Sequence, residues 1–370
     1  MRVKLEDVCK RIYAGGDVPK DRYSEVKTDE YSVPIYANAE KDEGLYGYTD
    51  KARENELSIT VAARGTIGFT SIRREPFLPV VRLITVVPDT KKVSERYLYY
   101  VLKNCKSYST GTSIPQLTVP DIKKKSFELC NIHEQEEIAD RLDKVNEIIQ
   151  LRKKELQLLE ELIKARFVEM FGDENNPQNW NIINVEDVAD VQVGVVIKPS
   201  QYYTDKGNGV KAFRSLNIGE GFIKDNDWVY FTEEGHKKNS KSIVKENDLL
   251  IVRSGAPGTA CVVTQKYIGY NAIDIIIVHP DCKKINPYYL CCYTNMPHGK
   301  KQINEGIGGA AQQHFNVGKY NKLRLMLPPK ELQDEFAAFI HQVDKSKVVV
   351  QKALDETQLL FDSLMQKYFG

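Results

Sequence analysis

The chain has 370 residues, of which 52 are basic and 51 acidic, so its formal net charge is +1. The length indicates two or three domains, and an apolar fraction of 42% allows each of them to bury a core. The sequence contains no apolar run of about 18 residues and no cysteine or histidine cluster with zinc-ligand spacing, which argues against a membrane span and a metal site and predicts a cytoplasmic protein with reduced thiols.

Residues 1–130 are predicted to form a mixed α/β domain. Short apolar runs alternate with glycine turns, and the runs at 57–61 and 83–87 are typical of strands. Helical spacing from Ser94 to Lys103 predicts a short helix with Ser94 as its N-cap.

A long helix is predicted over 131–171, with Asn131 as its N-cap. Its apolar residues recur at alternating steps of four and three, which is the period of a coiled-coil seam. A helix of about 38 residues would extend about 57 Å. The seam consists of Ile138, Leu142, Val145, Ile149, Leu156, Leu159, Ile163 and Met170, with Arg152 and Arg166 at the two skipped positions.

Residues 172–328 repeat the plan of the first domain. The polar, proline-containing stretch 172–177 marks the boundary between the two. The motif Glu54-Asn55-Glu56-Leu57 returns as Glu246-Asn247-Asp248-Leu249, and Val86-Val87-Pro88-Asp89 returns as Val278-His279-Pro280-Asp281. The sequence therefore predicts a second domain with the fold of the first.

A second long helix is predicted over 329–370, where Pro329 suits the first turn. Each seam position of the first helix has a counterpart in the second helix, at a constant offset in residue number. These counterparts are Phe336, Ile340, Val343, Lys347, Leu354, Thr357, Phe361 and Tyr368. The shared register predicts a duplicated α+β protein with pseudo-twofold symmetry, whose two long antiparallel helices pack as a coiled coil and separate the two domains. A zipper between two chains is the alternative.

Motifs for catalysis are sparse. No P-loop, no dinucleotide-binding glycine pattern and no nucleophile elbow is present. The stretch 286–289 resembles the Asn-Pro-Pro-Tyr motif of amino-methyltransferases but lacks its second proline, and a helix start explains it better. We therefore assign no catalytic and no metal-binding residue.

Features suited to nucleic acid recur at equivalent points of both halves. A polar glycine loop follows a predicted strand at 64–68 and again at 253–258, and a second polar loop closes each half. Arginine can pair with guanine, glutamine with adenine, and glycine lets backbone amides approach phosphate. The candidate DNA-contacting residues are Arg64, Gly65, Thr66, Arg73, Arg74, Thr112, Ser113, Gln116, Lys123 and Lys124 in the first half, and Arg214, Asn217, Arg253, Ser254, Gly255, Gln312, Gln313 and His314 in the second.

The order and duplication of these motifs resemble the specificity subunits of type I restriction-modification systems. The resemblance covers the whole chain and rests on the domain–helix–domain–helix repeat. It also rests on the two glycine loops with their preceding motifs, and on 133–138 with its second copy 331–336.

The resemblance implies two target-recognition domains, at 1–130 and 172–328, each reading one half of a split double-stranded DNA target. It implies that the helices at 131–171 and 329–370 set the gap between the half-sites and dock adenine methyltransferase subunits. A restriction and translocase subunit would complete the assembly, with S-adenosylmethionine, ATP and Mg²⁺ on those partners and none on this chain.

Two alternatives remain open. The chain is a stand-alone DNA-modifying enzyme if the purified protein methylates or cleaves DNA by itself. It is a two-headed protein-binding adaptor if it retards no DNA even when partner subunits are present.

Overall fold

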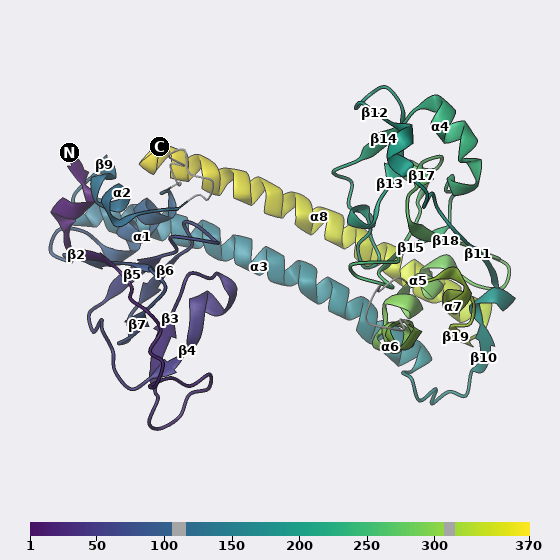
Figure 1. Cartoon of the computed structure of the whole chain (residues 1–370), viewed down its shortest axis with the longest axis horizontal. Helices are drawn as coiled ribbons and strands as arrows, with labels where there is room; N and C mark the ends of the chain where they lie inside the picture. Colours follow the sequence, from purple (N-terminus) through teal and green to yellow (C-terminus); the bar gives the residue numbers. More distant parts are fainter. Residues whose placement is uncertain (106–115, 307–314) are drawn as a thin grey trace. The chain divides into compact units, whose positions relative to one another are not determined.

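The computed structural model describes residues 1–105, 116–306 and 315–370. These residues form two compact units, which Figure 1 shows with their elements labelled. Unit 1 combines Met1–Lys153 with Lys352–Gly370, and unit 2 is Lys154–Gln351. Both chain termini therefore belong to unit 1.

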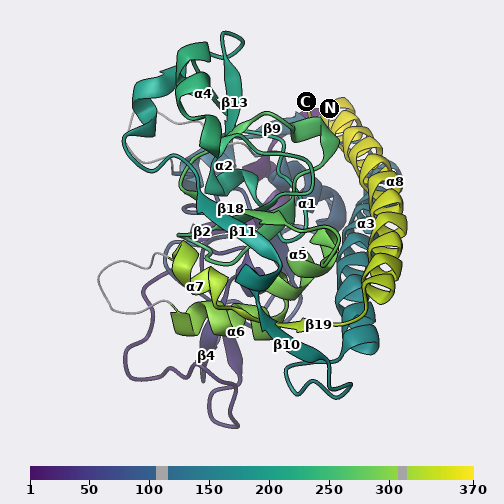
Figure 2. The same cartoon turned by 90° about the vertical axis from the view of Figure 1, so that its right-hand side faces the viewer.

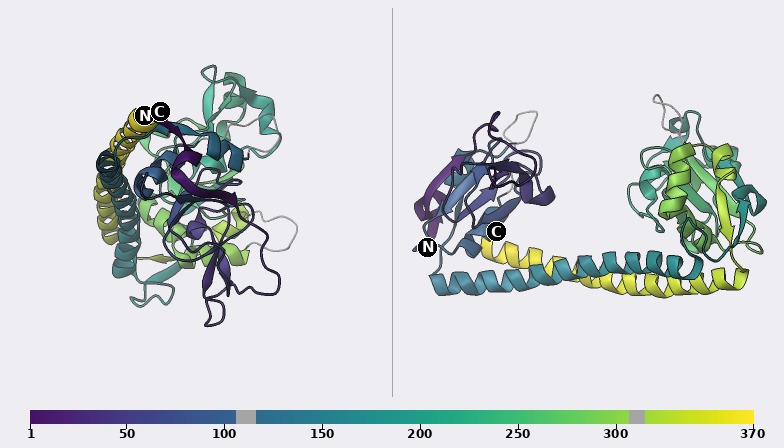
Figure 3. Two further views of the ribbon diagram at one scale, coloured as in Figure 1. Left: turned by 90° about the vertical axis from the view of Figure 1, so that its left-hand side faces the viewer. Right: turned by 90° about the horizontal axis from the view of Figure 1, so that it is seen from below.

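Unit 1 contains three sheets, and the left panel of Figure 3 faces it. Its strands are β1 (Arg2–Lys4), β2 (Cys9–Ala14), β3 (Val33–Tyr36), β4 (Leu45–Thr49), β5 (Ser58–Val61), β6 (Thr70–Arg73), β7 (Leu78–Pro79), β8 (Ile84–Pro88) and β9 (Ser126–Glu128). The main sheet is antiparallel with the order β2-β8-β5-β6. A second sheet has the order β4-β3-β7 with a parallel β3–β7 pair, and β1 pairs with β9.

Unit 2, which faces the viewer in Figure 2, is built in the same way. Its strands are β10 (Asn181–Asn184), β11 (Ala189–Val193), β12 (Tyr203–Thr204), β13 (Val210–Phe213), β14 (Val229–Phe231), β15 (Leu249–Val252), β16 (Ala260–Val262), β17 (Asn271–Ala272), β18 (Ile275–Pro280) and β19 (Arg324–Leu327). The main sheet has the order β11-β18-β15-β16, and β10 pairs with β19. The second sheet has the order β12-β14-β13-β17, again with one parallel pair, β13–β17.

The two units share one topology, strand for strand. Among the described residues, unit 2 has one further strand, β12, at the edge of its second sheet. The predicted strands at 57–61 and 83–87 are present as β5 and β8. The predicted α+β fold class and the internal duplication are therefore confirmed.

Short helices flank the sheets of both units. They are α1 (Glu95–Lys103) and α2 (Val119–Lys124) in unit 1, and α4 (Glu233–Lys238), α5 (Pro287–Asn295), α6 (Pro297–Gly306) and α7 (Val317–Asn321) in unit 2. The helix predicted from Ser94 to Lys103 is α1, and Ser94 is its N-cap residue as predicted, although its side chain does not cap the helix. The Ser94 hydroxyl makes no capping bond and is buried without a hydrogen-bond partner among the described residues.

The long helices are α3 (Ile132–Phe171) and α8 (Lys330–Phe369), each of 40 residues. The Asn131 side-chain oxygen accepts a bond of 2.9 Å from the Glu134 amide, so the predicted N-cap of α3 is confirmed. No described helix, these two included, combines the length and the apolar character that a membrane crossing requires.

The two long helices lie side by side within each unit, as the right panel of Figure 3 shows. In unit 1 the start of α3 meets the end of α8, where Arg141 Nη1 donates to the Tyr368 hydroxyl at 3.3 Å. In unit 2 the end of α3 meets the start of α8, where Arg166 pairs with Glu335 at 3.3 Å. The pairing is therefore antiparallel in each unit, as predicted.

All of the predicted seam residues are buried or half-buried. Leu142 and Phe336 are fully buried, and Ile149 and Ile340 are at most 7% exposed. Lys347 is half-buried at its seam position. Near the domains, additional aromatic residues that the seam pattern did not include become the centre of the packing.

Those aromatic residues join each helix pair to its domain. Phe167 and Phe171 of α3 are fully buried in unit 2 and contact the Tyr289 ring of α5, with ring centroids 5.6 and 4.8 Å apart. In unit 1 the last aromatic residue of α8, Phe369, meets Tyr97 of α1 at 5.1 Å. The ends of the long helices therefore belong to the domain cores.

A buried glutamine fixes the start of each long helix. Gln135 of α3 is fully buried, accepts a bond of 2.8 Å from the Ser94 amide and donates at 2.8 Å to the Cys130 carbonyl. Gln333 of α8 repeats this with the Asn286 amide and the Pro328 carbonyl, both at 2.8 Å. Each glutamine satisfies backbone groups that would otherwise be buried without a partner.

Replacing either glutamine should destabilise its own unit. We expect Gln135→Leu to cost about 2–3 kcal/mol, because a buried amide and a buried carbonyl lose their partners. Gln333→Leu should have the same effect on unit 2, measured as a lower midpoint of urea unfolding. The exposed Gln157 offers a matched control, for which Gln157→Leu should change stability by under about 0.5 kcal/mol. Equal effects of all three substitutions would contradict this role.

Candidate nucleic-acid interface

The predicted glycine loops form two equivalent turns. Turn 1 (62–69) follows β5, and turn 2 (252–259) begins at the end of β15. The Gly68 amide donates to the Ala62 carbonyl at 3.0 Å, and the Gly258 amide donates to the Val252 carbonyl at 2.9 Å. These bonds fix the register between the turns, so that each residue of turn 1 has a defined counterpart in turn 2.

Both turns require glycine at the same place. Gly65 and Gly255 have φ values of 68° and 86°, in the left-handed region that other residues adopt at a cost. Both are exposed at the tip of their turn, and a side chain at Gly255 would meet nothing within 4 Å. Backbone strain, and not lack of space, therefore explains the glycine.

The two arginines of the loops occupy neighbouring, non-equivalent positions. Leu117 donates its amide to the Ala63 carbonyl and Phe315 donates its amide to the Arg253 carbonyl, both at 3.0 Å. Arg253 is thus the counterpart of Ala63, and Arg64 is the counterpart of Ser254. Only turn 1 places an arginine next to its tip glycine.

The surroundings of the two arginines differ accordingly. Arg64 is exposed, and its Nη2 donates to Gln116 Oε1 at 2.9 Å, which orients the guanidinium and leaves its other donors available among the described residues. The Arg253 side chain is only 15% exposed, donates to the Phe315 carbonyl at 3.1 Å and forms an ion pair with Asp274. Arg64 can meet an external ligand, whereas Arg253 holds its own domain together.

Arg73 and Arg74 also differ from each other, because one is buried and the other is exposed. The Arg73 guanidinium is 5% exposed, lies 3.6 Å from the centre of the Tyr36 ring and pairs with Glu43 at 3.2 Å. Arg74 is exposed and pairs with Glu95 at 3.2 Å. Arg73 is therefore part of the framework of unit 1, and Arg74 remains open to a partner.

The other described candidates also differ in exposure. Lys124 is exposed at the end of α2, and the half-buried Lys123 lines a pocket beside β2. Asn217 is fully buried, accepts from the Arg214 amide at 2.8 Å and donates to the Asn226 carbonyl at 2.7 Å, so it holds a loop. The half-buried Arg214 pairs with Asp227 at 3.2 Å.

Thr66 and Ser254 lie on the surface of the two turns, with Thr66 exposed and Ser254 half-buried. The remaining candidates lie outside the described residues. They are Thr112, Ser113, Gln312, Gln313 and His314.

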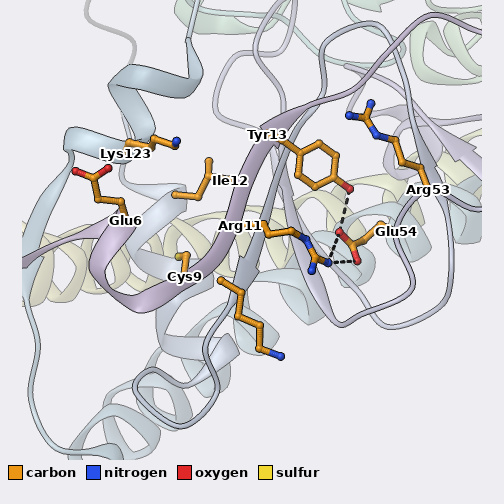
Figure 4. Close-up of a pocket in the computed structure, with 9 residues that line it drawn as sticks. Glu6, Cys9, Arg11, Ile12, Tyr13, Arg53, Glu54 and Lys123 are labelled. Carbon is orange, nitrogen blue, oxygen red and sulfur yellow. Dashed lines mark hydrogen bonds and ion pairs between the residues drawn. The ribbon is translucent and has the colours of Figure 1, made fainter.

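An open pocket of unit 1 lies beside β2 and is shown in Figure 4. Its volume is about 650 Å³, and Arg11, Arg53 and Lys123 contribute positive charge to its lining. Glu54 lies at its back and is 2% exposed. The Glu54 carboxylate accepts bonds from Arg11 Nη2 at 2.8 Å and the Tyr13 hydroxyl at 2.9 Å.

These bonds decide the ionisation of Glu54. Burial alone raises the pKa of its carboxyl group, but bonds from the Glu56 amide, Arg11 and Tyr13 outweigh burial and hold the pKa below its usual range. A carboxylate that stays ionised and has several donors is suited to a structural role. In the sequence, Glu54 stands out only as part of a repeated motif, and no pattern there links it to its partners Arg11 and Tyr13.

No group of three or more acidic, histidine or cysteine side chains in the described part of the chain is arranged to hold a metal ion. His279 contacts Asp248 at 2.6 Å and Gln192 at 2.7 Å. It is therefore a packed, hydrogen-bonded histidine.

Comparison with known proteins gives consistent similarities. The family model described as "Type I restriction modification DNA specificity domain" matches residues 1–161 and 177–357. A type I restriction enzyme specificity subunit of Methanocaldococcus jannaschii is 22% identical over 96% of this chain and 86% of its own length. A Mycoplasma pneumoniae protein, named provisionally as a type I specificity subunit, is 35% identical over 43% of this chain and 46% of its own, so that match spans about half of that relative.

The fold has a counterpart among solved structures. The crystal structure of a type I restriction-modification S subunit from M. genitalium aligns with all of this chain and 96% of its own, with a TM-score of 0.57 and 16% identity. At that identity the likeness concerns the fold alone.

The Glu54 cluster yields a prediction for pH. Because the folded-state pKa lies below the unfolded value of about 4.3, the ionised carboxylate stabilises unit 1 fully above about pH 5, and this contribution is lost as pH falls through the folded-state pKa. We expect Glu54→Gln to cost about 2 kcal/mol at pH 7, and the difference from wild type to narrow below about pH 4. Urea unfolding at several pH values measures both.

The neighbouring carboxylate provides the control. Glu56 bonds Lys10 and Arg11 but is 41% exposed, so Glu56→Gln should change stability little at any pH. If the difference in unfolding free energy between wild type and Glu54→Gln stays constant down to pH 3, the charge of Glu54 does not stabilise unit 1.

Proposed function

Because the chain belongs to the family of type I restriction-modification DNA specificity domains, we propose that it is the DNA-specificity subunit of such a complex. Each sheet domain reads one half of a split double-stranded DNA target. The observation that supports this most strongly is the duplication of a whole domain, down to the register of one exposed glycine turn. Two equivalent surfaces on one chain suit a target with two half-sites.

The proposed contacts in unit 1 are the exposed residues Arg64, Gly65, Thr66, Arg74 and Lys124 and the half-buried residues Gln116 and Lys123. In unit 2 we propose Ser254, Gly255 and Arg214. The candidates outside the described residues stay proposals. Arg73, Asn217 and Arg253 instead support the fold, because their polar groups are already bonded within the domain.

The long helices are proposed to set the gap between the half-sites and to dock adenine methyltransferase subunits. A helix of 40 residues extends about 60 Å, which exceeds one DNA turn of about 34 Å. Large apolar side chains remain on the outside of the helices, among them Leu158 at 52% and Leu359 at 69% exposure. Exposed apolar residues of this size are typical of contact sites for other proteins.

The chemistry is proposed to reside on the partners. The methyltransferase subunits would hold S-adenosylmethionine, and a restriction and translocase subunit would use ATP and Mg²⁺. We expect the isolated chain, with its net charge of +1, to bind DNA weakly and in a salt-sensitive way, and more tightly once the methyltransferase is bound.

Lengthening both helices tests the spacer role. Seven residues inserted between Lys153 and Lys154, and seven between Gln351 and Lys352, should add about 10 Å and preserve the seam. The methylated motif, mapped genome-wide in cells with the methyltransferase subunit, should keep both half-sites and gain about three unread base pairs, each about 3.4 Å long. An unchanged gap would contradict the spacer role.

Exchanging the turn residues tests base recognition. We expect Arg64→Ser to lose preference for one guanine in a single half-site by about tenfold or more, since a bidentate arginine–guanine pair contributes about 1–3 kcal/mol. Ser254→Arg should alter the other half-site only. Motif mapping of both variants measures the change position by position.

Arg64→Lys serves as the matched control, because it keeps the charge and loses the two-pronged donor geometry. If Arg64→Lys keeps full preference while Arg64→Ser weakens methylation at every site equally, Arg64 contacts phosphate and reads no base. If neither variant changes the motif, turn 1 does not contact DNA.

A further inference from the structure

The segment that leads into β8 contains a strained turn at the surface of unit 1. Turn 3 (80–83) is closed by a bond of 3.0 Å from the Leu83 amide to the Val80 carbonyl. Both central residues have positive φ, 51° for Val81 and 62° for Arg82, which is the pattern of a type I′ turn. Glycine, asparagine and aspartate dominate such turns, because a β-branched or bulky side chain is strained there. Val81 and Arg82 therefore adopt a conformation that their own side chains disfavour.

Neither strained side chain contributes to the core. Val81 is 46% exposed, and Arg82 is exposed as well. Within the described part of the chain, the Arg82 guanidinium has no hydrogen-bond or ion-pair partner. Backbone strain of this kind clusters at sites that bind or react, where it is part of the mechanism. Turn 3 thus presents an arginine and an apolar side chain to the solvent at a cost in stability.

Turn 3 lies beside turn 1. The strands β5 and β8 are neighbours, and turn 1 leaves β5 at the edge of the main sheet where β8 begins. The half-buried Asn38 joins the two turns. Its Oδ1 accepts a bond of 2.8 Å from the Ala63 amide of turn 1, and its Nδ2 donates to the Val81 carbonyl of turn 3. One side chain therefore fixes the spacing between the turn that carries Arg64 and the turn that carries Arg82.

The equivalent segment of unit 2 is one residue shorter. The amides of Val81 and Asp274 donate to the carbonyls two residues after β2 and β11, at 2.8 and 3.1 Å. The carbonyls of Leu83 and Ile275 accept bonds of 2.8 and 2.9 Å from the residues directly after the same strands. Val81 is thus the counterpart of Asp274, and Leu83 is the counterpart of Ile275. Arg82 is the extra residue of unit 1.

The two units also link their adjacent turns by different side chains. In unit 2, Asp274 pairs with Arg253, so both charges are used inside the domain. In unit 1 the neutral Asn38 makes the link, and Arg64 and Arg82 both remain at the surface. Turns 1 and 3 together therefore present two exposed arginines.

We propose that turn 3 is a second base-reading element of unit 1, in which Arg82 pairs with a guanine and Val81 contacts the methyl group of a nearby thymine. This inference rests on the proposed function. Arginine pairs with guanine through two donors, and an apolar side chain suits the thymine methyl group. A phosphate contact requires only a charge, so it explains neither the strained backbone nor the exposed valine beside the arginine. Because Asn38 holds the two turns together, they read nearby bases of one half-site.

Relieving the strain tests the inference. The double variant Val81→Asn, Arg82→Gly installs the residues that a type I′ turn favours, so its melting temperature should rise by about 3 °C. In cells with the methyltransferase subunit, genome-wide mapping of methylated adenine should show that preference for one guanine in a single half-site falls by about tenfold or more. The half-site of unit 2 should stay unchanged and serves as the internal control.

Arg82→Lys separates base recognition from charge. It keeps the charge and the strained backbone but loses the two-pronged donor geometry, so it should lose the same preference without the gain in stability. If Arg82→Lys keeps the wild-type motif while the double variant weakens methylation at every site equally, Arg82 contacts phosphate and the inference is overturned. A double variant that is less stable than wild type also overturns it, because the two side chains then support the fold.

The same mapping distinguishes this inference from the proposed function. If the wild-type chain directs methylation to a split motif and both variants keep that motif, turn 3 reads no base and only this inference fails. If the wild-type chain directs methylation to no split motif, the proposed function fails together with it.

Discussion

The packing of the long-helix ends into the domains is the constraint on which the rest of this fold depends. Neither domain completes its core with its own strands and short helices. Unit 1 needs the start of α3 and the end of α8, and unit 2 needs the opposite ends. The segments that complete one core are far apart in sequence, so each core combines side chains from both long helices.

The contacts at these junctions explain why the duplication has kept its register. A buried glutamine at each helix start bonds one amide and one carbonyl, and a shift by a single residue would rotate its side chain by about 100° and leave those groups unpaired. The tyrosine pair Tyr97 and Tyr289 adds a second constraint, since both hydroxyls donate to the backbone of the neighbouring edge strand. An apolar residue of the seam can be replaced by one of another size more easily than these hydrogen bonds can form in another register.

The long helices and the repeated domain could be predicted from the sequence because both leave periodic signals. The seam follows from apolar spacing, and the strands β5 and β8 follow from β-branched runs between turns. The roles of the arginines could not be predicted in this way. Arg73 and Arg253 are internal because Tyr36, Glu43 and Asp274, all distant in sequence, come to them in the folded chain.

The same limit applies to packing near the helix ends. The seam pattern pointed to Met170, whereas Phe167 and Phe171 form the centre of the junction. A heptad pattern describes the contact of a helix with one partner helix. At its end, α3 contacts α5 as well as α8, so the buried face is wider than the pattern assumes.

The division between framework and surface residues bears on how such a protein could acquire new targets. The buried polar residues, Glu54 and Asn217 among them, have their hydrogen bonds satisfied inside their own domain, so exchanging an exposed residue of turn 1 or turn 2 removes none of these bonds. Substitutions at such exposed places usually change stability by under about 0.5 kcal/mol. Arg64 on one turn and Ser254 on the other show that the two copies already differ at this point while sharing every surrounding backbone bond. A scaffold that separates its stability from its exposed turns can therefore vary what it recognises in one half without loosening the other.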